Sequence, residues 1–456
     1  MSTAVQETRG PQAVAPATQE GRYVEAFEAL ARHLPREPER LGALRRQAID
    51  RFVELGFPRT TMEEWRKTPL APIARAPFEL ASVDGAGLEG RAIEELVLAG
   101  CHTAVFVNGR FSPGLSDLED LPAGVVVDSI AAALESGDET VEQHLGRYAK
   151  FEEHAFVALN TALWSDGALV RLPRGVVVEK PIHLLFLGRP GESPTASFPR
   201  NLIVAEEQSQ ARVVEQYASL GDGVQLTCPV TEVLCGPAAV VDHYKLGRES
   251  IEAFHLGTLQ LLQDRDSAFS SHSISWGGAL VRNDVNAVLA GEGSDANLNG
   301  LYLVEGTQLV DNHMRVEHVS ANCSSHELYK GILEGQSRAV FSGRIYVHKG
   351  AQKTDAKQTN RNLLLSDQAL VNSNPQLEIF ADDVKCTHGS TVGRLDELAI
   401  FYLRSRGIGE EAARSLLTYA FASDIVGRVR VEPLRRELEE FLFRRLPKGD
   451  IVRQAV

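Results

Sequence analysis

The sequence predicts a mainly β protein, in which a long solenoid of short strands lies between two helical regions. Helical periodicity almost vanishes between Trp164 and Gly393, and short alternating or apolar runs punctuated by Gly, Asn, Asp and Ser replace it. More than 220 residues of strand are too many for one ordinary sandwich, so a barrel, a propeller or a parallel β-helix could hold them. No WD-like or kelch-like signature recurs, and the uneven spacing favours a solenoid of imperfect rungs.

Helices are expected on both sides of this β region. Before it, the sequence predicts four local elements: helices over 21–56 ending at Gly56, a hairpin about Asn108-Gly109, a helical patch near 129–134 and a short helix over 156–163. After it, three helices are predicted, over 395–404, 408–427 and 433–446. The expected regions are a disordered lead (1–20), a mostly helical N-terminal region (21–163), the β-helix core (164–393) and a C-terminal helical region (394–456).

Composition narrows the class of function. The chain has 456 residues and a formal net charge of −14, which argues against nucleic acid as the main partner because phosphate binding needs a basic surface. The five cysteines are scattered without a CxxC pair, so a reducing compartment is expected rather than a disulfide framework. We expect no membrane span, because no run of about 18 apolar residues occurs. The first 20 residues lack an apolar signal region, and a cytoplasmic location is predicted.

One segment, "QLEIFADDVKCTHGSTVG" (376–393), combines a strand pattern with metal-ligating side chains. Cys386 and His388 are two residues apart, so in an extended segment both point to one face. A thiolate and an imidazole suit iron or an iron–sulfur cluster, but such a centre needs about four ligands. A partner chain or exogenous sulfide would have to supply the others, which indicates a shared site. By its spacing alone, a structural cysteine beside a hydrogen-bonded histidine is the commoner reading.

Charged residues precede this pair. Asp382 and Asp383 could attract iron or simply form the turn, and the turn is the favoured reading. Lys385 points away from Cys386 in an ideal strand, so it has no part in lowering the pKa of the thiol.

A second group of candidate ligands is His313, His318, Cys323 and His326. A zinc site could be drawn from them, but His313 and His318 are five residues apart and so on opposite strand faces. Histidines at the surface or at solenoid corners are the favoured reading. Cys228 and Cys235 are expected in strands or in the core. The chain has no G-x4-G-K-[ST] motif, so any ATP dependence must come from a partner.

Three segments, in the right order, resemble the SufB/SufD family of iron–sulfur cluster assembly proteins. The longest match begins "GRIYVHKGAQKTDAKQTNRN" and runs over 343–393, "ALNTALWSDGALVRLPRGVVVEKPI" spans 158–182, and "EEAARSLLTYAFASDIV" spans 410–426. SufB-like chains usually carry an N-terminal cysteine cluster with CxxC spacing, whereas this chain has no cysteine before Cys101. Its "MEEWRKTPL" segment also looks like SufD, so the chain is identified as SufD-like, with SufB-like as the alternative.

The resemblance implies a right-handed parallel β-helix between helical ends and a scaffold subunit that is not itself an enzyme. It implies assembly with SufB and two copies of the ATPase SufC, and clusters built from iron and persulfide sulfur. Members place the cysteine and histidine matching Cys386 and His388 at the SufB–SufD contact, where iron or a cluster is held only transiently. In the family, the C-terminal segment docks SufC. The resemblance therefore implies that SufC binds an apolar stripe made of Ala413, Leu416, Leu417, Ala420 and Phe421.

Two other functions fit a β-helix. A self-associating homodimer could store or transfer iron. A polysaccharide lyase or hydrolase would use paired carboxylates in an open groove, but the export signal typical of such enzymes is missing and the adjacent Asp382 and Asp383 would point apart.

Overall fold

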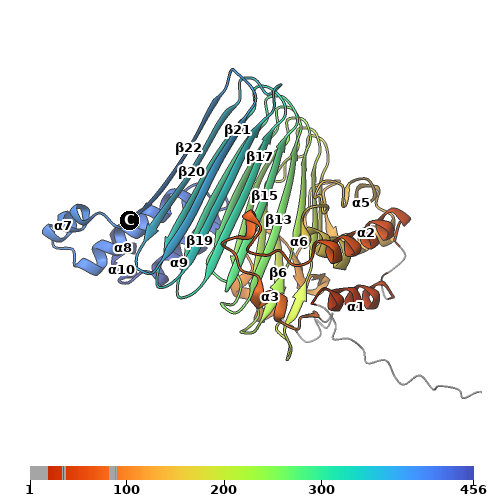
Figure 1. Cartoon of the computed structure of the whole chain (residues 1–456), viewed down its shortest axis with the longest axis horizontal. Coiled ribbons are helices and arrows are strands. Elements are labelled where there is room, and N and C mark those ends of the chain that lie inside the picture. Colours follow the sequence, from red (N-terminus) through yellow and green to blue (C-terminus); the bar gives the residue numbers. More distant parts are fainter. Residues whose placement is uncertain (1–18, 33, 35–36, 82–87, 89, 456) are drawn as a thin grey trace, which may run out of the picture.

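The computed structural model describes residues 19–32, 34, 37–81, 88 and 90–455. The predicted disordered lead therefore falls almost wholly outside the described residues. Figure 1 shows the described chain as a long stack of strands, with helices beside its first and last turns.

The stack is a parallel β-helix, which confirms the predicted fold class. Successive long strands alternate between two sheets, so the chain winds around one interior. Sheet A contains β5 (Ala168–Leu172), β8 (Arg200–Ala205), β11 (Val230–Cys235), β13 (Phe254–Gln263), β15 (Leu280–Leu289), β17 (Leu309–His318), β19 (Arg338–Val347) and β21 (Leu370–Ile379). Sheet B contains β2 (His102–Val107), β6 (Ile182–Gly188), β9 (Gln210–Ser219), β12 (Val240–Arg248), β14 (Ala268–Ser275), β16 (Asp295–Val304), β18 (Ser324–Leu333), β20 (Asp355–Leu364) and β22 (Lys385–Gly393).

Short strands complete the two sheets at their first turns. β3 (Arg110–Phe111) pairs with β2 and β4 (Val126–Ser129) pairs with β5, both antiparallel. β1 (Glu79–Leu80), β7 (Thr195–Ser197) and β10 (Gln225–Thr227) form a small parallel branch of sheet A. The β2–β3 hairpin turns at Asn108 and Gly109, as the sequence predicts.

Alternate residues of each strand fill the interior of the solenoid. At two positions a buried tyrosine lies against a glycine of the neighbouring strand. A methyl group at Gly331 would lie 2.1 Å from a ring carbon of Tyr302, and one at Gly300 would lie 2.2 Å from a ring carbon of Tyr329. Both tyrosines are almost fully buried, so these glycines are required by close approach rather than by backbone conformation.

The N-terminal helices cover the outer face of sheet A. They are α1 (Gln19–Ala31), α2 (Glu39–Leu55), α3 (Ala71–Arg75), α4 (Ile130–Ser136), α5 (Glu139–His144) and α6 (Ala155–Leu163), with 3₁₀ turns at Glu63–Trp65, Gly90–Ala92, Glu94–Leu96 and Pro113–Leu115. The stretch predicted as helical over 21–56 is thus two helices, and the second ends at Gly56 with φ 62°. Trp65 stacks on the buried Arg282 guanidinium at 3.8 Å, and Thr68 donates a 2.5 Å hydrogen bond to Asp311. These contacts fix the region to sheet A.

The C-terminal helices are α7 (Glu397–Ser405), α8 (Glu410–Val426), α9 (Glu432–Arg445) and α10 (Gly449–Ala455); the first three match predicted helices and α10 was not predicted. Of these helices, α8 and α9 pack on the outer face of sheet B, whereas α7 lies against α8. Apolar residues of α8 and α9 join a cluster with outward-facing residues of sheet B such as Leu246, Ile274 and Leu301. Among the described residues, no helix has the length and apolar character to cross a membrane.

Candidate functional site

The last turn of the solenoid ends in two unpaired strand edges. Among the residues that the structure describes, β21 pairs only with β19 and β22 only with β20, so both present backbone donors and acceptors on their outer side. Figure 1 shows β21 and β22 at the end of the stack opposite α1 and α2. Natural proteins usually cover or disrupt such an edge, and a long, regular, open one suits strand pairing with another chain.

Cys386 and His388 lie on β22, and as the spacing predicts they share one face. Their register partners on β20 are Ala356 and Gln358, which are 1% and 0% exposed. In parallel strands paired residues point the same way, so the thiol and the imidazole face the interior side of the solenoid. No further turn covers them, and His388 is exposed while Cys386 is half-buried. The pair therefore stands in the open mouth of the solenoid.

The surroundings of Cys386 keep its thiol protonated. It packs beside Ala356, Leu377 and Val384, and burial raises the pKa of the thiol. The backbone of Ala356 lowers that pKa and the charge of Asp355 raises it, but burial is the largest influence. A metal ion or a sulfur atom that binds here must displace a proton, since the thiolate is the ligand and nucleophile.

Asp382 and Asp383 lie in the turn that joins β21 to β22. Asp383 forms an ion pair with Lys353, and its backbone N–H donates a 3.0 Å hydrogen bond to Gln352. Asp382 is exposed to solvent. Across the described residues, no three His, Cys, Asp or Glu side chains gather into a metal site. This chain thus offers a pair of ligands rather than a full set.

Two further polar residues lie behind His388 in the same interior column. Gln358 on β20 is in register with His388, and Glu327 on β18 is in register with Gln358. Both are buried, with exposed fractions of 0% and 2%. Sequence reasoning missed them, although a repeat of about 30 residues between successive strands of one sheet was a signal that could have found them.

Comparison with known proteins bears on this geometry. The sequence model of the SufBD core domain of the SUF iron–sulfur cluster assembly system matches residues 187–421, and that of the SufBD N-terminal region matches residues 17–184. The chain belongs to the SufBD family. It is 33% identical to the iron–sulfur cluster assembly protein SufD of Escherichia coli over 408 residues, covering 88% of this chain and 92% of that protein.

Other SufBD relatives agree with this result. A SufBD family protein of Synechocystis is 32% identical over 87% of this chain and 89% of its own length. The SufD protein of Bacillus subtilis is 27% identical over 90% of this chain and 95% of its own length. The resemblance inferred from the sequence is therefore confirmed, and the protein is an iron–sulfur cluster assembly protein of the SufBD family.

The second group of candidate ligands is dispersed in this SufBD chain. His313 faces outward beside Asp311 at 3.0 Å, whereas His318 is buried and hydrogen-bonded to Ser325 at 2.9 Å. Cys323 is buried at a solenoid corner and His326 is exposed. The structure brings no zinc site together from them.

The remaining cysteines are core residues, as predicted for Cys228 and Cys235. Burial raises the pKa of Cys235 to about 12 and that of Cys101 to about 11, and it raises that of Cys228 further. Thiols this buried and this weakly acidic are poor nucleophiles.

The apolar stripe of α8 is only partly available at the surface. Ala413 is buried, Leu416 and Leu417 are half-buried, and Ala420 is exposed. Phe421 contributes to the contact with sheet B, because the Lys330 ammonium lies 4.6 Å from its ring and donates a 2.9 Å hydrogen bond to its carbonyl. The more exposed apolar surface is on α7, where Leu398, Phe401 and Tyr402 are 77%, 70% and 57% exposed.

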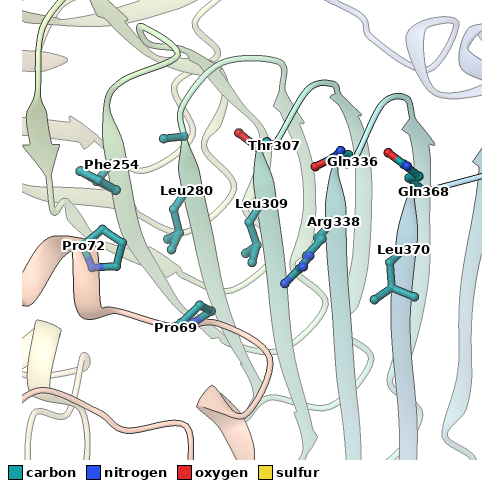
Figure 2. A pocket seen from close by; sticks show the side chains of 11 residues that line it. Pro69, Pro72, Phe254, Leu280, Thr307, Leu309, Gln336, Arg338, Gln368 and Leu370 are labelled. Carbon is teal, nitrogen blue, oxygen red and sulfur yellow. The ribbon is translucent and has the colours of Figure 1, made fainter. Parts of the chain in front are cut away.

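A groove of about 680 Å³ on the outer face of sheet A lies apart from Cys386 and His388. Figure 2 shows it between Pro69 and Pro72 on one side and a row formed by Phe254, Leu280, Leu309, Arg338 and Leu370 on the other. Arg338 is the only charged side chain in its lining, which contains no His, Cys, Asp or Glu. The groove therefore lacks the thiolate, imidazole and carboxylate ligands that iron prefers.

Proposed function

We propose that this chain is the SufD-like scaffold subunit of an iron–sulfur cluster assembly complex. In this proposal the open edges of β21 and β22 pair with a SufB-like subunit, and Cys386 and His388 supply this chain's share of the ligands for iron or a nascent cluster. The observation that supports the proposal is that a thiol and an imidazole share one face of β22, the last strand of sheet B, whose outer edge is open. Two ligands at an open edge form half of a site, and a second chain can supply the rest.

The role proposed for this chain is to hold and position its cargo rather than to catalyse a reaction. The SufC ATPase would bind the C-terminal helices and change the relative arrangement of the two scaffold subunits when it binds ATP. Only three residues separate the end of β22 at Gly393 from the start of α7 at Glu397. A movement of α7 therefore acts directly on the strand that carries Cys386 and His388, and nucleotide binding can shift the population toward an open site.

The site is tested by replacing His388 with alanine in the co-expressed complex. We expect iron and sulfide content to fall to a small fraction of the wild-type value, because one of few cluster ligands is removed. The matched control is His326→Ala, which removes another exposed histidine, on β18, away from the terminal turn. Equal iron and sulfide content in the His388→Ala and wild-type complexes would contradict the proposal that His388 is a ligand. If the chain purified from cells associates only with further copies of itself, the homodimer hypothesis replaces the scaffold hypothesis.

The SufC contact is tested on α7. Phe401→Asp is expected to weaken binding of SufC by about 30-fold, because the loss of an aromatic anchor from an interface costs roughly 2 kcal/mol or more. The matched control is Ile251→Asp, since Ile251 is 68% exposed on a turn remote from α7. Calorimetric titration of purified SufC into each variant measures the effect. Unchanged affinity in Phe401→Asp would exclude α7 from the contact and leave the exposed part of the α8 stripe.

A further inference from the structure

The interior column behind His388 contains a glutamine held in one orientation. The Nε2 atom of Gln358 donates a 2.8 Å hydrogen bond to Oε2 of Glu327 on the preceding strand of sheet B. Across the interior lies Gly343 of β19, where a methyl group would approach Nε2 to 2.1 Å. The amide therefore lies flat against the opposite sheet, and the glycine there provides the space for it.

The other end of this amide has no protein partner. Among the described residues, Oε1 of Gln358 accepts no hydrogen bond, although the side chain is fully buried. A buried acceptor left unpaired costs about 1–3 kcal/mol, so such an atom calls for an explanation. The oxygen and nitrogen of an amide diverge from one carbon. With the nitrogen bonded to Glu327 on β18, the oxygen is the end of the amide left for another partner, and the register partner of Gln358 on the next strand, β22, is His388.

We propose that Gln358 is a positioning residue for His388. Rotation of the exposed His388 imidazole brings one ring N–H to the unpaired Oε1 of Gln358, and this hydrogen bond selects the tautomer. The second ring nitrogen then keeps its lone pair and faces the open mouth of the solenoid. That iron or a cluster uses this lone pair rests on the proposed function. The orientation of the His388 ring is argued from the geometry of the column alone. Metal-binding histidines are commonly fixed in this way by an acceptor on their other nitrogen.

Glu327 completes the arrangement by holding the amide. Burial raises the pKa of its carboxyl to about 8, opposed by the hydrogen bond from Gln358, so the group is largely neutral at pH 7. A neutral carboxyl can accept from the amide without placing an uncompensated charge in the interior. The carboxyl of Glu327 thus fixes which end of the Gln358 amide is turned toward β22.

The test is ¹⁵N NMR of the histidine rings in the full, metal-free chain, with the His388 signals assigned by their loss in His388→Ala. We expect wild-type His388 to show one dominant tautomer. Gln358→Met, which keeps the length of the side chain but has no acceptor, is expected to move both ring nitrogens toward the average of two exchanging tautomers. Lys357→Met is the control, because it introduces methionine at the neighbouring position of β20, which is exposed.

A second variant keeps the proposal testable if Gln358→Met does not fold. Glu327→Met releases the amide without altering a neighbour of His388 in the ladder, and the same loss of tautomer preference is expected. Glu327→Gln retains a carbonyl acceptor and should preserve the wild-type ring signals. Unchanged His388 nitrogens in Gln358→Met, or in Glu327→Met if only that variant folds, would overturn the proposal.

In the assembled complex, Gln358→Met is expected to lower iron affinity about 10- to 100-fold, as is typical when an outer partner of a metal ligand is lost. The two proposals fail separately. If Gln358→Met changes the tautomer while His388→Ala leaves cluster content intact, the cluster site falls and the positioning role stands. If His388→Ala empties the site while Gln358→Met leaves the ring signals unchanged, the positioning role falls and the cluster site stands.

Discussion

Replacing Glu232 with leucine is expected to destabilise the protein by about 3–5 kcal/mol, because it breaks a buried ion pair on one side only. Glu232 accepts a 2.8 Å hydrogen bond from Arg200, and both side chains are at most 1% exposed. It also accepts from the backbone N–H groups of Gly146, Tyr148 and Ala149 at 2.7–2.9 Å. The substitution leaves a buried guanidinium and three backbone N–H donors without this acceptor.

The Glu232 carboxyl is held ionised in the native state. Burial alone would raise its pKa, but the charge of Arg200 and the hydrogen bonds outweigh burial and lower it. Its contribution to stability is therefore present above the unfolded pKa and is lost as the pH falls through the lower folded value. Urea unfolding at pH 7 measures the effect. Glu207→Leu is the control, because the Glu207–Arg174 pair lies at the surface, with side chains 31% and 69% exposed, and is worth about 0–1 kcal/mol. Equal losses in both variants would contradict the prediction.

Replacing Glu327 with glutamine is expected to stabilise the protein at high pH and not at low pH. Its folded pKa of about 8 lies above its ordinary value of 4.5, so between these values the folded state binds more protons than the unfolded state. Stability then falls as the pH rises through that window. Glutamine removes the titration and keeps an acceptor for Gln358. The variant should gain roughly 3–5 kcal/mol relative to wild type between pH 4 and pH 9.

The measurement is the difference in unfolding free energy between Glu327→Gln and wild type across that pH range. The control is Glu334→Gln, because it makes the same substitution at an exposed residue directly after β18. If the free-energy difference for Glu327→Gln changes with pH no more than that for Glu334→Gln, ionisation of the buried carboxyl does not destabilise the folded protein, and the prediction is wrong.

The shared face of Cys386 and His388 could be predicted because it depends only on the two-residue period of a strand. The same local reasoning correctly placed the hairpin at Asn108-Gly109 and the end of α2 at Gly56, where turn residues fix the backbone. It did less well on the α8 stripe. Helical spacing identified a single apolar face, but Ala413 is buried, Phe421 contacts Lys330 of sheet B, and Ala420 is exposed. Which part of a helix is covered depends on where the helix lies, and periodicity does not specify that.

By itself, the sequence determined the β-solenoid class, the helical ends, the SufBD resemblance and the pairing of a thiol with an imidazole on one strand face. Only the tertiary structure decided that this face is turned to the interior, in an open mouth, with Gln358 and Glu327 stacked behind His388. The reason is physical. Strand periodicity is set by neighbouring residues, whereas the register of a parallel sheet is set by strands about 30 residues apart, through packing of whole turns that no local pattern encodes.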